Sequence, residues 1–126
     1  MKQTIIMIIC IIILVVGGIV EVKYLEKSSL YITSDMEYIQ NAVQNKNFIS
    51  ASEQMDKSYD TWTKTKNFWN IFIIHEEIDD IEEAMIELKE YIKYENEEEC
   101  IVAISKIKEF LKHTVQRQEL KIDNVL

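Results

Sequence analysis

The stretch from Ile78 to Ile92, IDDIEEAMIELKEYI, carries the clearest structural pattern in the chain. Its large apolar residues recur at intervals of three and four, and at 100° per residue they share one helix face. These residues are Ile78, Ile81, Met85, Leu88 and Ile92. The opposite face carries the carboxylates Asp79, Asp80, Glu83, Glu87 and Glu90. The stretch therefore predicts an amphipathic helix with one buried face and one solvated, acidic face.

A second helix is predicted directly downstream. Asn96 is a favourable N-cap, and Glu99 stands three residues later, as in a capping box. The apolar face that follows consists of Cys100, Ala103, Ile104, Ile107, Phe110 and Leu111. The short link predicts that these two helices form an antiparallel hairpin. Cys100 lies on the apolar face beside three glutamates, which disfavour a thiolate, so we interpret it as a core residue.

Two more helices are predicted upstream. The first has the apolar stripe Leu25, Ile32, Met36, Ile39 and Val43 and ends at the polar turn 45–47; the second has the stripe Phe48, Met55, Tyr59, Trp62 and Trp69. The chain has no proline and only two glycines, which favours long helices joined by short turns. The fold class predicted is all-α, either a four-helix bundle or two stacked antiparallel hairpins offset by 49 residues, with Asn47 and Asn96 at equivalent helix starts.

An uncharged, isoleucine-rich segment runs from Thr4 to Val20 (TIIMIICIIILVVGGIV). As a helix it would span about 26 Å, close to the thickness of a bilayer core, with Tyr24 at interface depth. No small-x-small cleavage site follows the segment. We therefore predict a retained membrane anchor in residues 1–24 that continues into an acidic helical domain, residues 25–126.

Charge gives the expected orientation and excludes one class of partner. Lys2 is the only charged side chain before Glu21, so residues 21–126 carry all 22 acids against 13 of the 14 bases. An acidic domain of this kind should repel nucleic acid. Lys2 and the amino terminus favour a cytoplasmic N-terminus and an extracytoplasmic domain, although Lys23 and Lys27 stand on the other side of the segment.

The spacing Trp62-x(6)-Trp69-x(2)-Phe72-x(2)-His75-x-Glu77-Ile78-Asp79-x(2)-Glu82 supports a family resemblance. With the anchor and the acidic hairpin, the chain resembles an uncharacterised family of short, single-pass membrane proteins of spore-forming Gram-positive bacteria, described only as a domain of unknown function. The resemblance implies membrane attachment and a helical domain. It implies no activity, cofactor or catalytic residue.

Two groups of residues are candidates for a site. The aromatic group Trp62, Phe68, Trp69 and Phe72 is either core or an interaction surface, because tryptophan is enriched at binding hot spots. A weaker metal candidate consists of His75, Glu76, Asp79 and His113. Helical geometry turns the two histidines away from the apolar seam, whereas a zinc site needs three or four converging ligands.

No nucleophile–base pair or phosphate-binding loop is visible, so we expect neither an enzyme nor a bound cofactor. We expect an extracytoplasmic protein-interaction or assembly module, anchored through membrane lipid and bound to a protein partner. The alternative is a ligand- or metal-sensing domain at the membrane surface.

Overall fold

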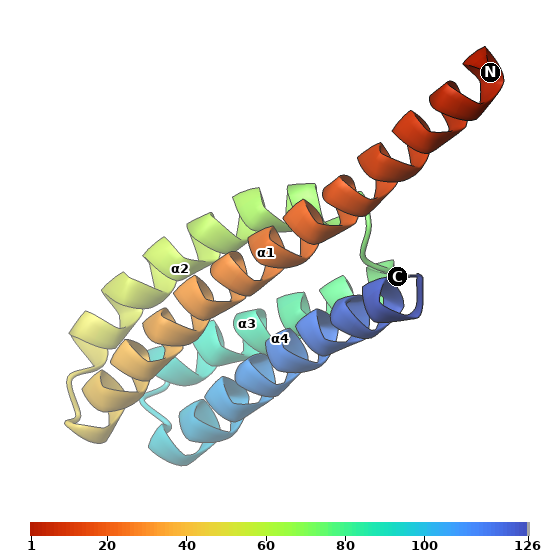
Figure 1. The fold of residues 1–126 in the computed structure, drawn as a ribbon. Coiled ribbons are helices and arrows are strands. Elements are labelled where there is room, and N and C mark those ends of the chain that lie inside the picture. Colours follow the sequence, from red (N-terminus) through yellow and green to blue (C-terminus); the bar gives the residue numbers. More distant parts are fainter. Residues whose placement is uncertain (126) are drawn as a thin grey trace.

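The computed structural model describes residues 1–125, which form four helices. They are α1 (Lys2–Gln44), α2 (Phe48–Trp69), α3 (His75–Lys93) and α4 (Glu97–Val125). Helix α1 packs against α2 and α4, and α3 packs against the same two helices (Figure 1). The predicted all-α class is confirmed. Because α1 closes onto α4, the arrangement is a four-helix bundle of consecutive antiparallel helices. Leu126, the last residue of the predicted domain, lies outside the described residues.

The core consists of the stripes that the sequence predicts. Every large apolar position of the α3 stripe is buried, as are the five α1 positions from Leu25 to Val43. Helix α4 contributes Cys100, Ala103, Ile104, Ile107 and Leu111, with Phe110 packed at the edge. The side chains meet along the bundle axis, so each helix buries one face and exposes the other. Burying a residue of the size of leucine or isoleucine contributes about 1.5–3 kcal/mol.

The α1–α2 and α3–α4 turns have the same backbone geometry, 49 residues apart. Lys46 has φ 60° and Glu95 has φ 54°. The N–H of the next residue donates to a carbonyl five residues back in both turns: Asn47 to Ala42 at 2.8 Å and Asn96 to Tyr91 at 3.0 Å. This is the Schellman arrangement at a helix C-terminus.

Each turn leads directly into an asparagine cap. The Asn47 Oδ1 accepts from the Ser50 N–H, and the Asn96 Oδ1 accepts from the Glu99 N–H, both at 3.2 Å. The predicted helix starts are therefore confirmed. The predicted 49-residue correspondence holds for these two turns and caps, within one closed bundle.

Glycine in place of Lys46 or Glu95 should stabilise each turn, because the left-handed conformation costs a residue with a side chain about 1 kcal/mol. We expect Glu95→Gly to raise the free energy of unfolding by about 1 kcal/mol. Lys46→Gly should gain less, because it also removes the exposed ion pair between Lys46 and Glu97. Asn45→Gly is the control, since Asn45 has φ −86° and glycine gains nothing there. Chemical unfolding in detergent measures the changes; equal effects at positions 45 and 95 would contradict the assignment.

The N-terminal part of α1 leaves the bundle without a break in the helix. Helix α1 continues through Gly17 and Gly18, and its first part projects beyond the other three helices (Figure 1). The large apolar side chains from Ile5 to Leu14 are all exposed, whereas Leu25 is fully buried. One helix of the described chain, α1, is long and apolar enough to cross a membrane, and none of that apolar window is buried. The prediction that the apolar segment continues into the first bundle helix is confirmed.

Candidate functional site

The two tryptophans of the aromatic candidate group are core residues. Trp62 and Trp69 are fully buried and pack edge to face, with ring centroids 5.6 Å apart. The Trp69 Nε1 donates to the Ser28 Oγ at 3.1 Å. Of the two alternatives that the sequence left open, the burial of Trp62 and Trp69 favours core residues over an interaction surface. The other two members differ: Phe68 is exposed, and Phe72 is partly buried.

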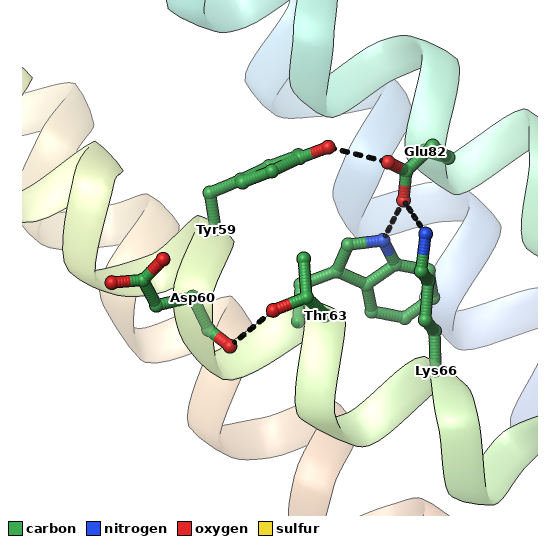
Figure 2. Close-up of polar contacts among 6 residues, drawn as sticks. Tyr59, Asp60, Thr63, Lys66 and Glu82 are labelled. Atoms are coloured by element: carbon green, nitrogen blue, oxygen red, sulfur yellow. Dashed lines mark hydrogen bonds and ion pairs between the residues drawn. The ribbon is translucent and has the colours of Figure 1, made fainter.

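Glu82 is the polar centre of the α2–α3 interface (Figure 2). Its carboxylate accepts hydrogen bonds from the Tyr59 hydroxyl at 2.5 Å, the Trp62 Nε1 at 2.5 Å and the Lys66 Nζ at 3.3 Å. Burial raises the pKa of Glu82, but these three hydrogen bonds and the charge of Lys66 outweigh burial and hold the pKa below its ordinary value. The carboxylate therefore holds α3 to three side chains of α2.

The same contact also changes the pKa of Tyr59. The hydrogen bond to Glu82, together with burial and the negative charge, raises the pKa of Tyr59 and keeps its hydroxyl protonated. The sequence indicated Glu82 only as the last position of the aromatic–acidic spacing. Its role was not predictable from the α3 pattern, because the donors come from another helix.

Glu82→Gln should destabilise the bundle at neutral pH by roughly 1–3 kcal/mol, because charge-assisted hydrogen bonds are lost. Since the folded-state pKa of Glu82 is lowered, its carboxylate stabilises the fold above the unfolded pKa, and this contribution is lost as the pH falls through the folded pKa. The difference in the free energy of unfolding between wild type and Glu82→Gln should therefore become smaller from pH 7 to pH 3. Urea unfolding at both pH values measures it.

The control for this experiment is Glu83→Gln. Glu83 is the next residue on α3 and is exposed. We expect little change in stability from this variant at either pH. The role assigned to Glu82 would be contradicted if the loss of stability in Glu82→Gln were the same at both pH values. It would also be contradicted if Glu83→Gln lost as much stability as Glu82→Gln.

The outer face of α3 carries an acidic groove with an apolar centre. Ile86 is 48% exposed, and the groove has a volume of about 550 Å³. The lining residues are Asp79, Glu82, Glu83, Ile86, Glu87, Glu90 and Tyr91. The predicted acidic face is thus present, and it differs from a plain solvated face in having an exposed isoleucine at its centre.

The metal candidates do not converge. Among residues 1–125 no group of three or more His, Cys, Asp or Glu side chains could hold a metal ion. His75, Glu76 and Asp79 are exposed at the start of α3, and the His113 Nε2 lies 3.3 Å from the Glu109 carboxylate of its own helix. The alternative of a metal-sensing domain gains no support from this geometry.

Cys100 lies in the core, as its position on the apolar face of α4 predicts. It is fully buried, and burial together with the nearby charge of Glu97 raises the pKa of its thiol to about 11. The thiolate is therefore scarce at neutral pH, and the side chain packs as a small apolar residue.

The end of the bundle from which α1 projects is here called the base. The connector 70–74 between α2 and α3 lies there, as does the C-terminal end of α4 (Figure 1). The Phe68 ring packs on Tyr24 with centroids 4.4 Å apart. Residues 70–74 join the end of α2 to the start of α3. They form a connector of mixed burial, since Ile73 is buried while Ile71 is 75% and Ile74 59% exposed.

A groove at the base joins the projecting part of α1 to the bundle. Its volume is about 550 Å³, and its lining comes from α1, the connector and α4. The lining residues are Ile11, Leu14, Val15, Gly18, Glu21, Phe72, Gln118, Lys121 and Ile122. Burial raises the pKa of Glu21, partly offset by the charge of Lys121. No sequence pattern predicted this groove, because its walls are far apart in the chain.

Nearby, an ion pair ties α3 to α4. Glu77, in the first turn of α3, is buried and pairs with Arg117 of α4 through one carboxylate oxygen. Its other oxygen is buried without a hydrogen-bond partner. The pair fixes the start of α3 beside the last turns of α4 and so helps to set the shape of the base.

Comparison with known proteins places the bundle in a family. Residues 19–125 match the family model described as Domain of unknown function (DUF4363). No curated protein and no solved structure matches the chain. The matched region begins two residues before Glu21 and contains the whole bundle. The match covers most of the chain, and this protein therefore belongs to the DUF4363 family, which confirms the expectation of a domain of unknown function.

Proposed function

We propose that the chain is a single-pass membrane protein whose apolar part of α1, from Thr4 to Val20, crosses the bilayer and carries the bundle on the extracytoplasmic side. The observation that supports this most is the unbroken α1, whose apolar residues pack against nothing before the groove and the bundle begin. A helix satisfies all its own backbone hydrogen bonds and can pass from water into hydrocarbon. On this proposal residues 1–24 are the anchor and residues 25–126 the extracytoplasmic domain.

Labelling of single cysteines tests the anchor and its orientation. In a background with Cys10 and Cys100 replaced by alanine, Ser105→Cys places a thiol on the exposed side of α4. A membrane-impermeant maleimide should label it in intact cells, whereas Gln3→Cys should react only after permeabilisation. The protein should stay in the membrane fraction at alkaline pH. The reverse labelling pattern would place the bundle in the cytoplasm, and release from the membrane would contradict the anchor.

We further propose that the bundle acts as an interaction or assembly module and has no catalytic role. The acidic groove of α3 is the surface offered to a protein partner. Ile86 supplies an apolar contact, and the surrounding carboxylates, among them Asp79, Glu83 and Glu90, favour a basic, amphipathic segment. In helix-in-groove recognition, an amphipathic helix places its apolar side chains in the groove and its charged side chains beside it. The same carboxylates disfavour nucleic acid.

Co-purification from membranes in mild detergent tests the partner surface. A bound protein should be lost or strongly reduced with Ile86→Glu, and its retention should fall with rising salt because the carboxylates are exposed. Val102→Glu is the matched control, since Val102 is 49% exposed on α4 and lies outside this groove. Neither change touches the core, so the helical signal should persist. Equal retention of the partner by both variants would remove α3 as the binding surface.

A further inference from the structure

The groove at the base has an apolar and a polar end. Ile11, Leu14, Val15 and Gly18 lie at intervals of three and four, so one face of α1 forms one wall. Ile122 lies opposite α1 at the level of Gly18, and Phe72 of the connector also lines the groove. The contact there is close: a Cβ on Gly18 would lie 2.7 Å from the Ile122 Cδ1. By contrast, a Cβ on Gly17 would meet nothing within 4 Å.

The length of the groove matches one leaflet of a bilayer. From Ile11 to Glu21 the helix rises about 15 Å, which is half of a hydrocarbon core of roughly 30 Å. Glu21 is the first charged residue after the apolar segment and therefore lies near headgroup depth. The polar end of the groove is thus at the membrane surface, and the apolar end points toward the middle of the bilayer.

The polar end carries both signs of charge. Lys121 is a cation suited to a phosphate, and Glu21 is a carboxylate suited to an ammonium group, with the buried Gln118 beside them. A volume of about 550 Å³ lies within the range of sites for small ligands. A ligand that combines an apolar chain with a zwitterionic headgroup complements both ends of the groove.

We propose that the groove binds a phospholipid of the bilayer that α1 crosses, with one acyl chain along Ile11–Gly18, its phosphate toward Lys121 and its ammonium group toward Glu21. This proposal rests on the membrane anchor proposed above. A lipid is favoured over a second copy of the chain, because the apolar wall of the groove continues the surface of α1 that contacts lipid chains on the proposed membrane anchor. The bound lipid would fill the space between α1 and the base and so fix the angle at which the bundle stands.

Photolabelling in vesicles tests the site. The full chain is reconstituted in phosphatidylcholine vesicles that contain phosphatidylethanolamine with a diazirine in the upper part of one acyl chain. After illumination, mass spectrometry should find label on the peptide that contains Ile122 and on the one that contains Phe72. Gly18→Phe, which fills the groove, should reduce this label several-fold. Gly17→Phe, whose side chain points into open space, should leave the label unchanged.

A second pair of variants keeps the photolabelling experiment informative if Gly18→Phe displaces the end of α4. Leu14→Trp fills the groove from a side chain that is 74% exposed, and Ile13→Trp is its control outside the lining. Thermal unfolding verifies that each variant retains the bundle. Label on residues 4–20 with none on Ile122 and Phe72, or equal label within both pairs, would overturn the lipid site while leaving the anchor intact. Cross-linking of two chains through the groove in place of lipid would also overturn it. Absence of label from residues 4–20 would instead refute the anchor.

Discussion

Helix α1 is hydrogen-bonded without interruption from Lys2 to Gln44, about 65 Å at 1.5 Å per residue, and helices α2 and α4 pack against its second half. The same rod is apolar on all sides up to Val20 and amphipathic from Leu25 onward. Because α2 and α4 both pack on α1, the direction of this helix sets the direction of the whole bundle. If the apolar segment crosses a bilayer as proposed, a continuous helix fixes the height and angle of the bundle above the membrane, which a flexible linker would not do.

Polar contacts between helices select one way of packing the apolar stripes. Stripes of leucine and isoleucine fit several rotations, but Glu82 finds its three donors only when α2 and α3 are in one register. On the other side of α2, Ser58 donates to the Asp35 carboxylate of α1 at 2.5 Å, and Trp69 donates to Ser28. A buried polar group without its partner costs about 1–3 kcal/mol, so misaligned packings are penalised. Helix α2 is thus fixed to both of its neighbours.

The two ends of the bundle differ in chemistry. The far end consists of two tight polar turns joined by the ion pair of Lys46 and Glu97. The base consists of an apolar connector, the last turns of α4 and the groove against α1. Ile71 and Ile74 are exposed at the base, but Ile49, beside the turn at the far end, is exposed to a similar degree. The two ends therefore differ in the groove and in the projecting apolar part of α1, and not in exposed isoleucines.

The sequence by itself determined the helices, their turns and the buried stripes, because the period of 3.6 residues and the caps are local properties of the chain. Only the tertiary structure decided that Trp62 and Trp69 are core while Phe68 is exposed, since burial depends on which helices lie opposite. It also showed Glu82 as an inter-helix contact, and it brought Ile122 beside Gly18 to form the groove. These features join residues that are far apart in the chain, and no local pattern records how helices pair across a bundle.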